Sequence, residues 1–217
     1  MNLALLAESA STYLEEASPE TIIAWTVKHF GDKVVVASSF EDCVLVDIAT
    51  KVDPQIEVIF LDTGFHFEET LAYVGQVSKL LNLNLRIVRP SIPLTESPCG
   101  SDLCCQVRKV QPLLLALSGK DAWITGLKRV DSPTRSATPV VAYDSDKGKL
   151  KVNPLINWTD EDIISYLHTH DLPAHPLWSK GYTSIGCAPT TRPPLPGEGR
   201  RSGRWAGTSK TECGLHT

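Results

Sequence analysis

Lys33-Val-Val-Val-Ala37, followed by Ser38-Ser39-Phe40-Glu41-Asp42, is the segment from which the architecture of this chain can be built. Its first five residues form a short β-branched run that is typical of a buried parallel strand. The polar residues after it lead into a helical pattern from about Cys43 to Val52. A strand, a polar loop and a helix N-terminus together can present backbone N–H groups to an anion. The loop has neither a Gly-x-Gly-x-x-Gly motif nor a Walker lysine, so an ordinary strand-to-helix turn remains the alternative.

The same pattern of strands and helices continues along the chain. It predicts a second buried strand at Glu57–Leu61, a helix at Phe67–Leu81 and a third strand at Leu85–Val88. A fourth strand is expected at Ala122–Thr125. Strands that alternate with helices in this way imply right-handed crossovers, so we expect a doubly wound, mostly parallel α/β sheet.

Other segments flank this alternation. Two amphipathic helices are expected before it, at Leu3–Glu16 and Pro19–Phe30. The later expected elements are a helix from Leu103 to about Leu117, a hairpin of Val140–Tyr143 and Leu150–Val152, and a helix at Asp160–His168. After Leu172 the chain becomes irregular, and residues 199–207 are too polar and glycine-rich to form a core. We therefore expect an α/β domain at residues 1–190 and a mobile C-terminal arm at residues 191–217.

Composition narrows the class of protein. The 217 residues are 42% hydrophobic and 21% charged, as in ordinary soluble globular proteins. The net charge of −4 argues against a general nucleic-acid binder, although a few local arginines could still hold a small anion. The sequence has neither a signal-peptide pattern nor an apolar run of membrane-spanning length. We expect a cytoplasmic protein whose six cysteines bind metal or take part in catalysis.

Two loops after predicted strands are candidate anion sites. Asp62-Thr63-Gly64 follows the second strand, at the carboxyl edge where open α/β sheets bind ligands. Lys128, Arg129 and Arg135 follow the fourth strand. Their spacing suits a clamp for phosphate or sulfate, and a solvated basic loop is the alternative.

Three cysteines suggest an iron–sulfur site. Cys104 and Cys105 are adjacent on a predicted helix, and Cys187 comes from a distant turn. Soft thiolates gathered in this way select iron–sulfur clusters, whereas simple burial of the pair is the alternative. Thr190 stands where a Cys-x-x-Cys motif would place a fourth ligand, and a threonine hydroxyl binds cluster iron poorly. Cys99 is close enough in sequence to substitute for it, although its spacing alone does not assign it that role.

Cys213 is the most unusual cysteine. It lies four residues from the end of the sequence, with Lys210, Glu212, Gly214 and His216 around it. Nearby Lys and His favour the thiolate, which is the nucleophilic form of cysteine. A catalytic cysteine and a tolerated tail cysteine are both compatible with this environment.

Assembled in order, these segments resemble the assimilatory sulfonucleotide reductases, in particular the bacterial-type adenylyl-sulfate (APS) reductases. The resemblance runs from about Lys33 to the C-terminus. It implies an adenine-nucleotide α-hydrolase-like fold related to the PP-loop ATP pyrophosphatases. The motifs that carry it are Ser38-Ser39-Phe40-x-Asp42, Leu61-Asp-Thr-Gly64, Cys104-Cys-x-x-Arg-Lys109, Gly126-Leu-Lys-Arg129 with Arg135, Asn153-Pro-Leu155, Gly181-Tyr-x-Ser-Ile-Gly-Cys187, Arg201-x-Gly-Arg-Trp205 and Lys210-x-Glu-Cys-Gly-Leu-His216.

The resemblance implies an enzyme of sulfate assimilation and cysteine biosynthesis. Its nucleophile would be Cys213, whose thiolate attacks the sulfur of APS, expels AMP and becomes an S-sulfonate. Thioredoxin, the implied partner, would then release sulfite. Ser38, Ser39 and the Asp62-Thr63-Gly64 turn match the nucleotide cradle of the family. The cations that match its substrate-binding positions are Lys109, Lys128, Arg129, Arg135, Arg201 and Arg204.

The resemblance also raises the question of a cofactor. Cluster-bearing members of the family use a Cys-Cys pair plus Cys-x-x-Cys and prefer APS, whereas cluster-free members reduce the 3′-phosphorylated substrate, PAPS. This chain matches three of those cysteines, Cys104, Cys105 and Cys187, and has Thr190 at the fourth. We expect APS reduction and a 4Fe-4S cluster on three cysteines plus another ligand. A degraded cluster, an empty site and a PAPS reductase are the alternatives.

Two rival functions come from other classes of protein. An ATP-dependent adenylyltransferase would need a Ser-Gly-Gly-x-Asp-Ser loop, and Ser38–Asp42 has no glycine. A protein that senses sulfonucleotides would bind nucleotide without releasing sulfite. Neither a nucleic acid nor a membrane is an expected partner, and the sequence leaves a homo-oligomer open.

Overall fold

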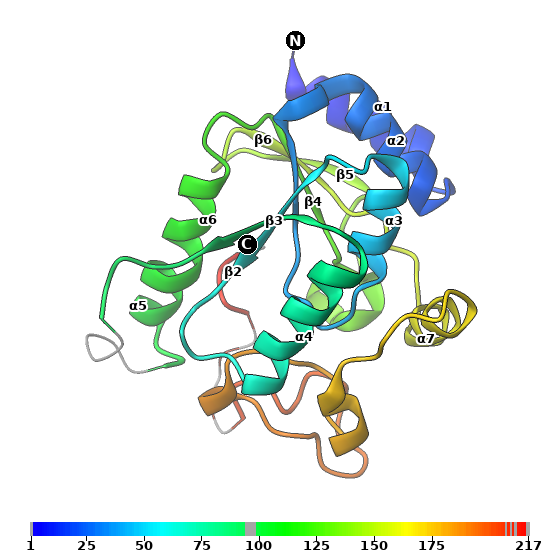
Figure 1. The fold of residues 1–217 in the computed structure, drawn as a ribbon. Helices are drawn as coiled ribbons and strands as arrows, with labels where there is room; N and C mark the ends of the chain where they lie inside the picture. Colours follow the sequence, from blue (N-terminus) through cyan, green and yellow to red (C-terminus); the bar gives the residue numbers. More distant parts are fainter. Residues whose placement is uncertain (1, 94–98, 207, 209, 211, 216–217) are drawn as a thin grey trace.

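The computed structural model describes residues 2–93, 99–206, 208, 210 and 212–215 (Figure 1). Strands and helices alternate through most of the chain, as the sequence predicts. The strands are β1 Val34–Ala37, β2 Glu57–Leu61, β3 Asn84–Val88, β4 Ala122–Thr125, β5 Val141–Asp144 and β6 Lys149–Val152. The α-helices are α1 Leu3–Leu14, α2 Pro19–Phe30, α3 Val44–Val52, α4 Glu68–Leu80, α5 Asp102–Cys105, α6 Gln111–Ala116 and α7 Asp160–Thr169.

These strands form a six-stranded sheet in the order β3-β2-β1-β4-β6-β5. All neighbouring pairs are parallel except β5 and β6, which form the predicted hairpin at one edge. The expectation of a doubly wound, mostly parallel sheet is therefore confirmed.

Alternate side chains of the central strands face two different helix layers. Val34 and Val36 of β1 belong to the larger core, which also contains side chains of α1, α2, α3, α4 and α7. Val35 belongs to a smaller core on the opposite face, with Ile59, Trp123 and three residues of the α6 region. Burial on both faces explains why β1 is a continuous β-branched run rather than an alternating one.

The order of the strands locates the functional edge of the sheet. From β1 the chain proceeds outward to β2 and β3, and it then crosses back to β4 on the other side of β1. Ligands of open α/β sheets bind outside the carboxyl ends of the strands at such a reversal. The loops after β1 and β4 therefore flank the expected crevice.

The helix predicted at Leu103–Leu117 is interrupted. Between α5 and α6 the chain makes a wide π-helical turn at Gln106–Val110, closed by the bond from the Gln111 N–H to the Gln106 carbonyl. Pro112 gives the physical reason. It has no N–H to donate to the carbonyl of Arg108, and its ring would collide with that carbonyl in a regular α-helix. Turns of this kind are frequent at functional sites, and this one carries Lys109.

Residues after Thr190 return to the same edge of the sheet. Thr191 pairs with Arg204 in an antiparallel bridge, and the Trp205 N–H donates to the Thr190 carbonyl at 2.8 Å. Trp205 is buried although it has a φ of +50°, so packing holds it in a conformation that non-glycine residues rarely adopt. The boundary at residue 190 and the mobility of residues 191–217 stay predictions.

No helix in the described ranges combines the length and the apolar character that a membrane crossing requires.

Candidate active site

The loop after β1 forms one wall of a pocket at the carboxyl edge of the sheet. The Ser38 N–H extends the ladder to the Ile59 carbonyl at 3.1 Å, and the Phe40 N–H then donates to the Ser38 hydroxyl oxygen, also at 3.1 Å. Phe40 has a φ of +53°, a backbone conformation that favours glycine. Its ring is buried edge-on against Phe60, with 5.7 Å between the ring centroids. Packing of Phe40 thus supports a tight loop that contains no glycine.

Asp42 ends this loop and lines the pocket. Its carboxylate accepts a hydrogen bond from the Val44 N–H at 3.0 Å, at the start of α3. Burial, together with the nearby charge of Glu41, raises the pKa of Asp42 to about 6. Asp42 belongs to the motif Ser38-Ser39-Phe40-x-Asp42 but was not among the predicted site residues.

Most of the predicted site residues lie around this one pocket. They come from the ends of β1 and β2, the turn before α6, the loop after β4 and the C-terminal segment. The predicted residues that line it are Ser38, Ser39, Thr63, Lys109, Lys128, Arg135, Arg201, Arg204 and Cys213.

Three of the predicted substrate-binding residues, Asp62, Gly64 and Arg129, do not line the pocket. Asp62 receives the Gly64 N–H and the Arg89 guanidinium, each at 3.0 Å, and so closes the turn after β2. Arg129 pairs with Glu15 just after α1 and donates to the Thr138 carbonyl at 2.9 Å. Its guanidinium is therefore engaged at the end of the N-terminal helix, and Arg129 is not part of the proposed site.

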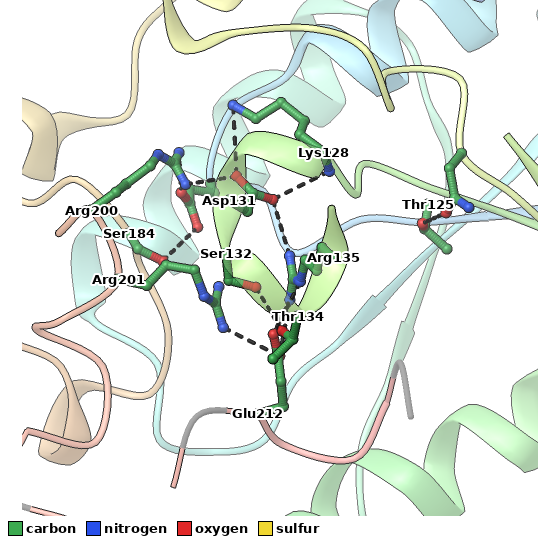
Figure 2. Close-up of polar contacts among 12 residues, drawn as sticks. Thr125, Lys128, Asp131, Ser132, Thr134, Arg135, Ser184, Arg200, Arg201 and Glu212 are labelled. Atoms are coloured by element: carbon green, nitrogen blue, oxygen red, sulfur yellow. Dashed lines mark hydrogen bonds and ion pairs between the residues drawn. The ribbon is translucent and has the colours of Figure 1, made fainter. Parts of the chain in front are cut away.

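Asp131 organises the cations of the loop after β4 (Figure 2). Its carboxylate accepts hydrogen bonds from Arg135 and Arg200, both at 3.0 Å, and from the backbone N–H of Lys128 at 3.3 Å. Arg200 also pairs with Glu41 at 2.9 Å and with Asp160 at 2.7 Å. The predicted clamp is thus surrounded by carboxylates, and neither Asp131 nor Arg200 was among the predicted site residues.

Glu212 connects the C-terminal segment to the same cations. It receives two hydrogen bonds from Arg135, at 3.0 and 2.9 Å, and one from Arg201 at 3.3 Å (Figure 2). The two-pronged pair with Arg135 fixes both distance and direction. It holds the residue before Cys213 against the pocket wall.

Lys109 and Arg204 differ from the other pocket cations. Across the described residues, neither has a carboxylate within ion-pair distance. Arg204 donates to the Ser184 hydroxyl at 3.3 Å and to the Ile185 carbonyl at 3.1 Å, and it stacks on Trp205. Its Nε is buried and has no hydrogen-bond partner in the described part of the chain. These two cations retain capacity for an anionic ligand.

Cys213 reaches the pocket because the segment around it is anchored on both sides. Lys210 donates to Asp102 at 2.8 Å, and its Nζ lies 3.3 Å from the sulfur of Cys105. On the other side, Leu215 packs on the smaller core, beside Val35 and Ile59. The thiol is half-buried and free, so it can meet a ligand in the pocket.

Four further thiols lie close together behind Cys213. Cys104, Cys105 and Cys187 are buried, and Cys99 is partly exposed. The Cys99 thiol lies beside Cys187, and this contact lowers the pKa of Cys187 and raises that of Cys99. No three described His, Cys, Asp or Glu side chains are close enough to hold a single metal ion. An iron–sulfur cluster is larger and holds its cysteines farther apart.

Comparisons with known proteins agree with this geometry. The family model described as phosphoadenosine phosphosulfate reductase domain matches residues 33–193. An adenosine 5′-phosphosulfate reductase of Mycolicibacterium smegmatis is 46% identical, over 97% of this chain and 93% of the relative. One of Streptomyces coelicolor is 44% identical, over 99% of this chain and 94% of the relative.

Solved structures give the same assignment of fold. A phosphoadenylyl-sulfate (PAPS) reductase from Candida auris, in a phosphate complex, superposes with a TM-score of 0.75 at 27% identity. It covers 86% of this chain and 96% of its own. An FMN adenylyltransferase from Candida glabrata has a TM-score of 0.62 at 14% identity, over 86% of this chain and 65% of its own, and so supports the fold alone.

Proposed function

Because this chain belongs to the phosphoadenosine phosphosulfate reductase family, as an enzyme that reduces a sulfonucleotide in sulfate assimilation, we propose that it reduces APS to sulfite and AMP with thioredoxin as reductant. The observation that carries the proposal is the position of Cys213. It lines a pocket at the reversal of strand order, together with two cations that lack carboxylate partners among the described residues. A nucleophilic thiol beside an anion site is what sulfonyl transfer from a nucleotide requires.

The chemistry balances on thiols alone. The Cys213 thiolate attacks the sulfur of APS, the bond from that sulfur to the bridging phosphate oxygen breaks, and AMP leaves. A thioredoxin thiolate then attacks the Cys213 sulfur, and sulfite departs with the electron pair of the sulfur–sulfur bond. The second thioredoxin thiol resolves the mixed disulfide. Two thiols become one disulfide, which supplies the two electrons that reduce sulfate to sulfite.

Pocket cations would stabilise the charge that moves in the first step. Lys109 and Arg204 can donate to the phosphate and sulfate oxygens of the substrate without breaking an ion pair. The loop after β1 would hold the nucleotide through its hydroxyls and backbone N–H groups. Cys104, Cys105 and Cys187 would hold an iron–sulfur cluster, which would supply a fixed local charge near the pocket.

The balance of charge favours APS over PAPS. Lys128, Arg135, Arg200 and Arg201 already pair with carboxylates. A 3′-phosphate adds almost two further negative charges, which would need cations of their own. A PAPS reductase remains the alternative function, because the Candida auris protein is described as one.

Sulfite release from APS and from PAPS, each with reduced thioredoxin, tests the proposal directly. We expect turnover of APS and a kcat/KM for PAPS that is lower by at least about tenfold. Faster turnover of PAPS would assign the alternative function. Tight AMP binding without sulfite from either nucleotide would indicate a sensor instead of an enzyme of this type.

Lys109→Ala should reduce turnover much more than stability. Lys109 lines the pocket, and its charge also acts on Cys105 and Cys187. Loss of one donor to a developing anion typically costs about 10²–10³-fold in kcat. Steady-state sulfite release would measure this, with Lys180→Ala as the control, because Lys180 pairs with Glu69 at the surface. An unchanged kcat would remove Lys109 from the site.

Glu212→Ala should slow turnover without weakening nucleotide binding. The substitution releases the segment that positions Cys213 and frees Arg135 and Arg201 for anions. We expect kcat to fall by about tenfold, which corresponds to roughly 1.4 kcal/mol of lost positioning energy. The control is Glu198→Ala, which removes a more exposed pair with Arg192. A weaker affinity for AMP with unchanged kcat would contradict this role.

A further inference from the structure

The family motif provides three cysteines for a cluster in this chain, but the cysteine group near the pocket has four members. They are Cys99, Cys104, Cys105 and Cys187. The side chain of Cys99 lies beside that of Cys187 and near that of Cys104. Cys105 follows Cys104 on α5. None of the four is in a disulfide. Two short segments and one distant turn thus deliver four soft donors to one place, which is the donor set of a 4Fe-4S cluster.

Thr190 occupies the motif position of a ligand but is engaged in other contacts. Its hydroxyl donates to the Cys187 carbonyl oxygen at 3.4 Å and lies beside the Cys99 thiol. Its methyl group lies beside Gly100, so close that a Cβ at position 100 would stand 2.7 Å from it. Gly100 has a φ of +95° and no side chain, which lets the residues around Cys99 approach Thr190. Thr190 therefore packs beside Cys99 and does not take the place of a ligand.

We propose that Cys99 is the fourth ligand of a 4Fe-4S cluster in this protein, together with Cys104, Cys105 and Cys187, and that Thr190 is a hydrogen-bond donor to the Cys99 sulfur. Each thiol gives up its proton when it binds iron. The contact between the Cys99 and Cys187 thiols would then be replaced by two separate sulfur–iron bonds. In this assignment the fourth thiolate comes from residue 99 instead of residue 190, and the cluster keeps four thiolate ligands.

The surroundings of the four sulfurs suit a negatively charged group. Lys210 lies 3.3 Å from the Cys105 sulfur, and the Thr63 hydroxyl lies 3.5 Å from the Cys187 sulfur. The positive charge of Lys109 acts on both of these cysteines. Hydrogen bonds and positive charge at thiolate sulfurs stabilise a ligated cluster and tune it. Lys210 lies three residues before Cys213, so the cysteine group is physically connected to the catalytic segment.

Anaerobic reconstitution of the full chain with ferrous iron and sulfide tests the proposal. The readouts are iron and acid-labile sulfide per chain, visible absorption, and the paramagnetic resonance spectrum of the reduced protein. We expect about four irons and four sulfides per wild-type chain. Cys99→Ser should retain at least about tenfold less iron, because it replaces one of four thiolates with a hydroxyl, which binds cluster iron poorly.

Three variants make the assignment specific. Thr190→Ala should keep the cluster, and Cys43→Ala should keep it too, because Cys43 is buried in the larger core with its thiol on the Pro173 carbonyl. The double variant Cys99→Ser/Thr190→Cys should regain iron, because it restores four thiolates. Circular dichroism of each iron-free variant would identify any failure to fold.

The outcomes separate clearly. Full iron content in Cys99→Ser overturns the proposal, and so does loss of iron in Thr190→Ala to the level of Cys99→Ser. A wild-type chain that takes up no iron also overturns it. The ligand assignment depends on the proposed function in one respect only, namely that the bound group is a 4Fe-4S cluster. Sulfite release and AMP binding, measured separately, would show whether the proposed function fails even where the ligand assignment holds.

Discussion

Cys213→Ser abolishes sulfite release from APS while the protein still binds AMP. The serine hydroxyl has almost the same shape as the thiol, but it stays protonated at neutral pH and is a weak nucleophile without a dedicated base. No S-sulfonate can then form, and thioredoxin has no sulfur to attack. We expect kcat to fall by at least about 10³-fold, as is usual when a covalent nucleophile is removed.

The structure explains why binding should survive this substitution. Cys213 is half-buried at the edge of the pocket, and the segment around it is held by Glu212, Lys210 and Leu215. None of these anchors depends on the thiol. A calorimetric titration of the variant with AMP should therefore give nearly the wild-type affinity.

Mass spectrometry supplies a second measurement. Wild-type protein mixed with APS in the absence of thioredoxin should gain the mass of one sulfonate group on the peptide that contains Cys213. The serine variant should gain none. A sulfonate on another cysteine, or sulfite release by the serine variant, would show that the nucleophile lies elsewhere.

Asp131→Ala should be the most destabilising single change at the site. The Asp131 side chain is only 8% exposed and faces Lys128, Arg135 and Arg200. Its removal leaves these cations with less compensation at a buried place, and breaking one side of a buried ion pair costs about 3–5 kcal/mol. Urea unfolding followed by circular dichroism would measure the loss, which should appear in the midpoint at an unchanged m-value.

Asp121→Ala is the matched control for this prediction. Asp121 also pairs with a lysine, Lys33, but the two side chains are 43% and 58% exposed. Exposed pairs contribute about 0–1 kcal/mol, so this variant should unfold close to wild type. Equal losses in the two variants would mean that burial of the Asp131 network contributes nothing to stability.

The fold could be predicted because its signals are local. The β-branched run Val34–Val36 has to be a buried strand wherever it lies, since both faces of it are apolar. Ser18 and Pro19 likewise begin α2 through contacts within one turn. The exception was the helix before β4, where Pro112 forces a wide turn that a hydrophobic pattern does not report.

Individual roles in the site could not be predicted in the same way. Arg129 and Arg135 lie in one basic loop, and their spacing gives no reason to separate them. Packing sends Arg129 to Glu15, 114 positions away, and turns Arg135 toward Glu212, 77 positions away. Long-range ion pairs of this kind depend on which surfaces the sheet brings together, and a local pattern carries no information about them.

The same contrast applies to the cysteines. Residue identity alone established that Cys213 sits in a polar, cationic segment and that Thr190 is a poor ligand for iron. Only the folded chain brings Cys99 to Cys187, 88 positions later, and lets Gly100 make room for Thr190. Thiol chemistry is a property of each residue, whereas a ligand set is a property of distances, and distances exist only once the chain has folded.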